Sequence, residues 1–556
     1  MKRAALLAVC FTLLPAACTP EPVVSPPPTV PPVSASRQLP PPPQEPFILA
    51  EDHFPEAEQR WFAAAQEPGT VTSRVQDSVL ELDVNLPDET HAVLLRTLED
   101  IDGQLGAFSL SLRVEERPFF LTIGVREADE SYYGTVLFLH PEDGARQIQV
   151  DLNWLALSAD SVDENHQLDH SQLHDIVVLD ASAFLGWTGS GTLILEDATM
   201  WEGDAAPLQL FCAGGVVENQ PLTVGVDASY IPQAIERGMN WYVGETPVDP
   251  LELFAAQGAE GFRLRIWVGD DGESRLNYAT DMALQAEAAG LRVYPVLFLS
   301  PSWADVNSQD APPAWESLTL DDRAEAIRAY SEATTRHLLD HGLQPPYYEI
   351  GNEIDFGVSG VFAAFGQRDL ATLRTDIWPD EARLLQAAIE GVRTADPDAM
   401  IMLHIALSVD ATFASAFYTS MQDLGVDYDL IGLSFYPAAF GPLASADLCR
   451  TLGMLREQVG LPVVFAEFAY PASTPTGGLF GSWKYELPGY PLTPEGQAAW
   501  IADFLTSLRA NPDVVGAYYF SPDFSWSGEL WTPFALFDEN NMARPGLGAF
   551  GPSTPQ

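Results

Sequence analysis

The chain has 556 residues, 47% of them hydrophobic, which allows two or three domains with sizeable cores and excludes wholesale disorder. Acidic residues outnumber basic ones by 78 to 27, the net charge is −51, and Lys2 and Lys484 are the only lysines. Such a surface repels nucleic acid and anionic lipid and disfavours a polyanionic substrate, although adaptation to salt would produce the same charge. We therefore expect no nucleic-acid partner.

The N-terminus, "MKRAALLAVCFTLLPAACTP", has two basic residues, an apolar stretch and then small residues, the pattern of a secretory signal. Cys18 follows Ala16 and Ala17, which resembles a bacterial lipoprotein cleavage site, but Pro15 stands where leucine is commoner and leaves plain secretion open. Residues 1–18 are thus predicted to be a lipoprotein-type signal peptide. We expect an exported protein, held at the cell surface or outer membrane by a lipid anchor in the envelope membrane, or otherwise secreted.

Residues 19–46 are rich in proline and predict a stiff, extended linker. Short apolar segments follow, often alternating and separated by turn residues, such as "SVLELDVNL" (78–86) and "FFLTIGVRE" (119–127). They predict an all-β sandwich module over residues 47–215. The end of this module, "HDIVVLD…GTLILEDATM", resembles the jelly-roll modules often attached to carbohydrases, so we interpret it as carbohydrate-binding-like.

Four aromatic residues of the module allow two interpretations. They form a face on which sugar rings stack, or they fill the sandwich core: Tyr132, Tyr133, Trp154 and Trp187. If they stack on sugars, the module is separable. Its removal would then weaken retention on insoluble polymer and spare the hydrolysis of soluble oligosaccharides.

The cysteines beyond the signal are few. Cys10 leaves with the signal peptide, and Cys212 and Cys449 lie in different predicted domains. An oxidising compartment would allow these two to pair, but we expect two buried free thiols. No Cys/His cluster has the spacing of zinc ligands, and we expect no metal and no cofactor.

The pattern of apolar residues along the sequence changes near residue 222. Segments of helical period, such as "DDRAEAIRAYSEATTRHLLDHG", now separate eight apolar, strand-like runs: "LTVGVDAS", "FRLRIWV", "LRVYPVLFL", "PYYEIGNE", "AMIMLHI", "DLIGLSFY", "LPVVFAEF" and "DVVGAYYF". This alternation predicts an α/β domain, a (β/α)8 TIM barrel, over residues 222–550. An open doubly wound sheet is the alternative, but it usually has a glycine-rich phosphate turn after its first strand, and "VGVDASYIP" is not one.

Two carboxyl groups are predicted to meet at the mouth of this barrel, where the carboxyl ends of all strands lie. Asn352 and Glu353 close the fourth strand, and Glu467 closes the seventh. A single glutamate at a strand end is often only a salt-bridge partner. Two converging carboxyl groups are what glycosidic cleavage requires, because one must be protonated to assist the leaving group and the other ionised to attack the sugar.

Other strand ends fit the same site. In "FRLRIWV", Arg263 and Arg265 share one parity, so an arginine on the barrel axis can hold the attacking carboxylate ionised; a buried structural ion pair is the alternative. Tyr436 ends strand six, where its hydroxyl can donate to Glu467 or simply fill the core. Three more candidates for the cleft follow strands five and three: His404, whose role is equally open to a structural reading, Trp303, a stacking platform, and Asp305.

Taken in order and with barrel spacing, these motifs resemble glycoside hydrolase clan A and, more narrowly, family 53, the endo-β-1,4-galactanases. The matching segments lie within residues 222–535: "GVDAS", "FRLRIWV", "SWADV", "GNEIDFG", "LHI", "IGLSFYP" and "VFAEFAYP". The resemblance implies that Glu353 is the acid/base, Glu467 the nucleophile, and Asn352 a ligand of the sugar 2-hydroxyl. It also implies that Arg263 and Tyr436 orient the nucleophile.

The sequence departs from the family pattern at two places that line the cleft in the family. His-Tyr usually precedes the Trp-Ala-Asp motif, where this chain has Phe298 and Leu299. Trp-Glu usually ends the last strand, where this chain has Phe520 and Ser521. Some bacterial members bind calcium through Asp-rich loops, but the corresponding loop here, "PASTPTGGLFGSWKYELPGYPLTPEG", has no Asp.

The sequence therefore predicts a monomeric, retaining endo-glycosidase that acts on a polysaccharide, β-1,4-galactan (arabinogalactan) or a related neutral β-glycan. Two alternatives stay open. One keeps the chemistry and changes the polymer to a β-mannan, a β-glucan or another plant or algal glycan. The other is a surface glycan-binding protein whose barrel has lost activity, although the retained Asn352, Glu353, Glu467 and Tyr436 argue against loss.

Overall fold

The structure is a computed structural model. It describes residues 30, 47–87, 90–158, 161–163, 165, 167–212, 222–477, 480–528 and 530–551. The predicted signal peptide and all of the linker but Val30, Cys18 included, lie outside the described residues. Within the described part, no helix combines the length and apolarity needed to cross a membrane.

The N-terminal domain is the predicted β-sandwich. Two antiparallel sheets, ordered β3-β4-β12-β6-β9 with β1 beside β12, and β10-β8-β7-β11-β5-β2, pack face to face. The strands are β1 Phe47–His53, β2 Trp61–Ala65, β3 Thr70–Gln76, β4 Val79–Leu86, β5 Ala92–Thr97, β6 Ala107–Glu115, β7 Phe119–Glu127, β8 Tyr132–Leu139, β9 Arg146–Asp151, β10 Ala156–Leu157, β11 Leu173–Asp180 and β12 Gly189–Glu202. Alternation sets the register, since every second residue of β4, such as Leu80 and Leu82, points into the core.

The aromatic residues considered for sugar stacking are part of cores and interfaces. Tyr133, Trp154 and Trp187 are 3%, 6% and 2% exposed. The Tyr132 hydroxyl is also buried. The sugar-stacking interpretation is therefore wrong for Tyr133, Trp154 and Trp187. The core interpretation is confirmed for Tyr133, whereas Trp154 belongs to a small separate cluster and Trp187 packs with the core of the barrel.

The C-terminal domain is the predicted TIM barrel. Eight parallel strands close in the order of the chain: β13 Thr223–Asp227, β16 Gly261–Ile266, β17 Arg292–Leu297, β18 Tyr348–Ile350, β21 Ile401–Ile405, β22 Leu430–Phe435, β23 Val463–Phe468 and β24 Val514–Phe520. Two hairpins lie outside the barrel: β14 Trp241–Val243 with β15 Thr246–Val248, and β19 Gly357–Val358 with β20 Val361–Phe362. Seven of the eight strand runs are apolar throughout or nearly so because both faces are buried, which is the habit of parallel strands covered by helices.

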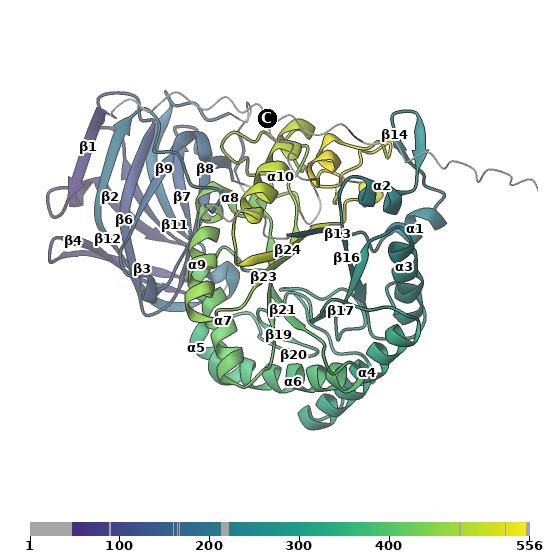
Figure 1. The fold of residues 1–556 in the computed structure, drawn as a ribbon. Helices are drawn as coiled ribbons and strands as arrows, with labels where there is room; N and C mark the ends of the chain where they lie inside the picture. The colour runs from purple at the N-terminus through teal and green to yellow at the C-terminus, as the bar shows by residue number, and fades with distance from the viewer. Residues whose placement is uncertain are drawn as a thin grey trace, which may run out of the picture.

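Helices surround the barrel in a ring (Figure 1). They are α1 Ile231–Glu236, α2 Pro250–Ala256, α3 Leu276–Ala288, α4 Leu320–Asp340, α5 Leu370–Thr372, α6 Trp378–Ala395, α7 Ala411–Asp423, α8 Pro437–Ala446, α9 Leu448–Gln458 and α10 Pro494–Arg509. A π-helical turn, Leu373–Ile377, joins α5 to α6. After α3 and α4 the chain turns back through Gly290 and Gly342, whose φ angles of +92° and +87° are the left-handed values that glycine adopts without strain.

The opposite end of the barrel has a different backbone. Leu299, Glu353 and Ser521 follow β17, β18 and β24 and have φ angles of +56°, +46° and +48°, although none is glycine. Such residues cost about 1–3 kcal/mol each and persist only where the surrounding structure holds them. The backbone at the carboxyl ends of these strands is therefore bent away from the path that local preference favours.

The sandwich packs against the α7–α9 side of the barrel (Figure 1). Strand β8 lies on α8, and Leu443 of α8 is buried in the sandwich core. Charged groups flank this apolar contact. His140 pairs with Asp410 at 2.8 Å, with both side chains 2% exposed, and Arg146 makes two hydrogen bonds to Asp447, at 2.7 and 3.0 Å. The two domains thus share a continuous buried interface.

A disulfide joins Cys212 to Cys449, with 5.0 Å between their Cα atoms. The prediction of two free thiols is therefore wrong. It assumed that separate domains keep the cysteines apart, whereas the segment after the sandwich passes along the barrel beside α9, where Cys449 lies.

Candidate active site

The ends of strands β18 and β23 bring Glu353 and Glu467 to the same place, the mouth of the barrel. Glu467 is 2% exposed, and both of its carboxyl oxygens accept hydrogen bonds. Arg263 donates to Oε1 at 2.7 Å, and the Tyr436 hydroxyl donates to Oε2 at 2.5 Å. The structure thus makes the contacts that the sequence suggested for Arg263 and Tyr436, and it leaves Glu467 fixed in orientation.

Arg263 is the centre of a fully buried charge network. Its guanidinium is bidentate to Glu349, at 3.0 and 2.6 Å, and also donates to Asp227 at 2.9 Å and to Asn352 Oδ1 at 2.6 Å. Burial alone would raise the pKa of Glu349, but the neighbouring Arg263 and His404 outweigh it and hold this pKa at about 2. Glu349 and Asp227 were not among the site residues predicted from the sequence. A carboxylate inside the apolar run "YYEI", with a buried arginine in the second strand to pair with, is the signal that would have found Glu349.

Asn352 is completely buried and held at both ends of its amide. Its Oδ1 accepts from Arg263, and its Nδ2 donates to the Ala304 carbonyl at 2.8 Å, which leaves its second N–H without a partner among the described residues. Gln309 donates to the backbone carbonyls of Asn352 and Glu353, at 2.8 and 3.2 Å. These bonds support the left-handed backbone at Glu353.

Glu353 has an environment opposite to that of Glu467. Burial, the facing Glu467 carboxylate and Asp305 all raise the pKa of Glu353 well above its usual value. One contact opposes this rise: the Ser434 hydroxyl donates to Glu353 Oε1 at 2.7 Å. Pairs of carboxyl groups whose environments differ in this way are suited to separate acid and base roles.

The remaining predicted residues surround this pair. His404 is completely buried and connects Glu349 to Ser434, through contacts of 2.9 Å on each side of its ring. Arg265 is also buried, with its guanidinium 4.0 Å from the centre of the Tyr230 ring and 3.4 Å from Asp227. Trp303, half-buried, donates to Asp305 at 3.0 Å. Arg265 and His404 thus lie behind the surface of the mouth, and Trp303 lies at it.

Aromatic side chains form one wall of the mouth. Trp303 lies beside Phe520, which meets Trp531, and Tyr436 lies between Phe520 and the half-buried Trp483. The wall stands beside the Glu467–Tyr436 bond. Only Trp303 and Trp483 in it are partly exposed, and their rings are of the kind on which sugars stack. Trp483 and Trp531 were not among the predicted site residues, because they come from long connections without strand or helix periodicity.

The two departures from the family pattern lie at different depths. Phe298 and Leu299 are 0% exposed, and Phe298 packs inside the barrel. The prediction that both segments line the cleft is therefore wrong for Phe298 and Leu299. Phe520 belongs to the aromatic wall, and Ser521 is buried next to it in sequence. The last strand thus shapes the mouth directly, and the third strand does so only through packing.

Asp523, two residues after Ser521, is also buried. Neither of its carboxyl oxygens has a hydrogen-bond partner among the described residues, and burial raises its pKa to about 7. The guanidinium of Arg265 partly opposes this rise. The neighbourhood of Arg265 therefore holds polar groups that the fold itself does not satisfy.

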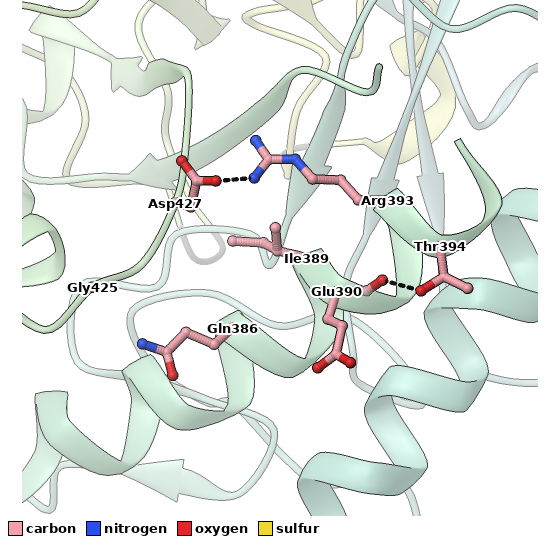
Figure 2. A pocket seen from close by; sticks show the side chains of 7 residues that line it. All are labelled: Gln386, Ile389, Glu390, Arg393, Thr394, Gly425 and Asp427. Carbon is pink, nitrogen blue, oxygen red and sulfur yellow. Dashed lines mark hydrogen bonds and ion pairs between the residues drawn. The ribbon is translucent and has the colours of Figure 1, made fainter. Parts of the chain in front are cut away.

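Two features outside the mouth, an acidic cluster in the sandwich and a groove beside α6, do not form a convincing functional site. In the sandwich, oxygens of Glu127, Asp129 and Asp163 lie within 4.8 Å of one another, but the carboxyl groups already accept bonds from Ser131 and from nearby backbone, and we propose no metal there. Figure 2 shows a groove of about 390 Å³ between α6 and the chain near Gly425. Arg393 pairs with Asp427 there, and the exposed Glu390 is the remaining charged residue that lines the groove.

A closed eight-stranded barrel with two such carboxyl groups at its mouth is the architecture of a glycoside hydrolase. The model of glycosyl hydrolase family 53 matches residues 223–550, and the chain belongs to this family. It is 28% identical over 337 residues to an arabinogalactan endo-beta-1,4-galactanase of Thermothelomyces thermophilus, covering 59% of this chain and 98% of the relative. It is 31% identical over 327 residues to an uncharacterized protein in the bgaB 5′ region of Niallia circulans, covering 57% and 87%. The catalytic domain of the Ignisphaera aggregans family 53 enzyme superposes with a TM-score of 0.52 at 27% identity, covering 61% and 98%.

Proposed function

We propose that the protein is a retaining endo-β-1,4-galactanase in which Glu353 is the acid/base and Glu467 the nucleophile. Membership of family 53 and the similarity to named arabinogalactan endo-β-1,4-galactanases support the substrate. The observation that carries the assignment of roles is the contrast between the two carboxyl groups. Glu467 accepts bonds on both oxygens, whereas burial and like charge raise the pKa of Glu353.

The reaction follows from this contrast. Glu353 gives its proton to the glycosidic oxygen while a Glu467 oxygen forms a bond to the anomeric carbon and the leaving chain departs. Glu353, now ionised, then takes a proton from water, whose oxygen attacks the same carbon and releases Glu467. The second N–H of Asn352 is available to the 2-hydroxyl of the sugar. Tyr436 and Arg263 keep the attacking oxygens in place.

The substrate is testable on a panel of polysaccharides. We expect release of reducing ends from β-1,4-galactan, with oligosaccharides as early products because cleavage is internal, and no release from polygalacturonan, because the protein carries a net charge of −51. Reducing-end assays and product sizing provide the measurement. Absence of cleavage of every neutral β-glycan, by protein shown to be folded, would contradict the proposal.

Phe520 favours a second candidate within the same chemistry. Because this residue and Ser521 replace the family's Trp-Glu at the aromatic wall, we propose that galactan is cleaved but that another neutral β-glycan, such as a mannan or glucan, is cleaved faster. The same panel decides. If galactan is the best polymer tested, the altered specificity is wrong and the galactanase proposal stands.

We also propose export and lipid attachment at Cys18. The support is the sequence of the N-terminus and, independently, the Cys212–Cys449 disulfide, since disulfides persist in oxidising compartments. The Cys18→Ser variant is expected to move from the membrane fraction to the soluble fraction of the producing cell, with unchanged specific activity. Identical fractionation of the two proteins would refute the anchor and leave plain secretion.

A further inference from the structure

A line of buried hydrogen bonds runs from Arg263's partner Glu349 to Glu353. Glu349 Oε1 lies 2.9 Å from His404 Nδ1, His404 Nε2 lies 2.9 Å from Ser434 Oγ, and Ser434 Oγ lies 2.7 Å from Glu353 Oε1. The first three residues are at most 1% exposed, and Glu353 is 8% exposed. Water therefore has no access to the three inner groups.

The chemistry of the four groups restricts where hydrogens lie. Glu349, bound by Arg263 and with its pKa held near 2, is an acceptor, so His404 carries a hydrogen on Nδ1. Arg263 also approaches Nδ1, but at 3.5 Å, and the shorter contact with Glu349 decides the tautomer. The Ser434 hydroxyl has one hydrogen and two partners, His404 Nε2 and Glu353 Oε1.

Two arrangements satisfy every bond. In the first, Glu353 carries a proton on Oε1 and donates to Ser434, which donates to the bare Nε2 of neutral His404; for the acid step the carboxyl group turns so that this hydrogen faces the substrate. In the second, the Glu353 proton has passed to Ser434 and the Ser434 hydrogen to Nε2. Glu353 is then a carboxylate that accepts from Ser434, and His404 is an imidazolium between Glu349 and Ser434. One proton is shared and none is gained or lost.

We propose that Glu349, His404 and Ser434 are positioning residues that act through Glu353, and that Ser434 couples the protonation of Glu353 to that of His404. This inference rests on the proposed role of Glu353. The coupling matters for the reaction when Glu353 is ionised. Whenever Glu353 is a carboxylate, and so ready to act as the base, Ser434 holds Oε1 through a charge-assisted bond and leaves Oε2 for the substrate side.

Other ionisable groups surround this line of hydrogen bonds and affect the pKa of Glu353, but none of them is a member of the line. Those facing Glu353 or His404 are Glu467 on β23, Tyr436 after β22, Asp305 after β17, Asp355 after β18 and Arg263 on β16. All of them are unchanged when Ser434 loses its hydroxyl, so the effect of that one group is separable.

The test compares Ser434→Ala with wild type. The hydrogen bond from Ser434 lowers the pKa of Glu353. Loss of this bond is therefore expected to shift the upper limb of the kcat/KM pH profile to higher pH by about one unit, and Ser434→Thr is expected to restore the wild-type position of the limb. Ser408→Ala is the matched control. Ser408 is an equally buried serine that donates to the Ser434 carbonyl and not to Glu353, and its loss is expected to leave the limb in place.

A second measurement does not depend on activity. The chain has nine histidines, so 15N-histidine labelling gives a simple spectrum, in which His404→Asn identifies the His404 signals. We expect the Nε2 signal to shift with pH in step with Glu353, and Glu353→Gln or Ser434→Ala to abolish this shift. If Ser434→Ala lowers kcat/KM equally at every pH and the Nε2 signal is the same in all variants, the coupling is wrong. If wild type cleaves no glycan, the proposed function is wrong, and the spectra still decide the coupling.

Discussion

The Glu467→Gln variant is expected to lose at least about 10³-fold in kcat on polysaccharide, because an amide cannot form the covalent intermediate. Glu353→Gln is expected to lose a similar factor on polysaccharide, where the leaving sugar needs a proton. On an aryl glycoside whose phenolate leaves unprotonated, its first step is expected to be largely spared. Steady-state kinetics and a pre-steady-state burst of phenolate separate the two variants.

Two controls make this result specific. Glu381→Gln removes a completely buried glutamate of α6 outside the mouth, and its activity is expected to stay within about twofold of wild type. Azide added to alanine variants reports stereochemistry, since Glu353→Ala is expected to give a β-glycosyl azide and Glu467→Ala an α-glycosyl azide. Activity within tenfold of wild type in either glutamine variant, with normal melting, would remove that residue from its role.

Deletion of the sandwich is expected to destroy the activity of the barrel on soluble oligosaccharides as well as on polymer. This reverses what a separable module would do. Strand β8 supports α8, and α8 begins directly after Tyr436, which holds Glu467. Deletion would also remove His140 and Arg146, the partners of Asp410 and Asp447, and would expose the apolar surface of α8 that the sandwich covers. Soluble yield, melting temperature and hydrolysis of a short galacto-oligosaccharide provide the measurements.

A milder variant keeps this prediction testable if the deleted protein fails to fold. His140→Ala is expected to lower the melting temperature, and Arg113→Ala, on a surface strand away from the barrel, is expected to change it little. Burial by itself would lower the pKa of His140, but the Asp410 carboxylate outweighs it and raises this pKa. The stabilisation is therefore complete below the ordinary histidine pKa and is lost as pH rises through the raised value. A truncated barrel with wild-type kinetics and melting would restore the separable module.

The eight barrel strands were predictable because doubly buried parallel strands have continuous apolar sequences, and because their carboxyl ends share one side. That rule alone predicted that Glu353 and Glu467 lie close together. The barrel prediction implies a helix between the fifth and sixth strands, but the sequence of α7 does not itself show a helical pattern. Its sequence, "ATFASAFYTSMQD", is buried on nearly every side, so it lacks the polar stripe that reveals a helix period. The sandwich strands β1, β2 and β3 were missed because they are short or largely exposed, and β5 was missed although every second residue of it is buried.

The rest of the site depends on relations between distant segments. Ser434 precedes the predicted Tyr436 by two residues, yet its sequence neighbourhood says nothing of Glu353, 81 positions away. The same limit explains the disulfide, whose cysteines are separated by 237 positions, and Trp187, which donates to the Arg368 carbonyl of a barrel that the module's own sequence does not contain. A strand pattern specifies which way a side chain points but not which side chain it meets.

The left-handed residues give the barrel two ends with different tolerance of change. At the end where helices return to strands, glycines such as Gly290 and Gly342 occupy the positions that need φ above zero, so the backbone there is relaxed. At the mouth the same backbone shape is imposed on a glutamate, a leucine and a serine, which glycine would relieve. Because the acid/base proposed here is itself one of the strained residues, stability and chemistry compete for a single position. Selection for a more stable protein and selection for a faster one therefore act in opposite directions at Glu353.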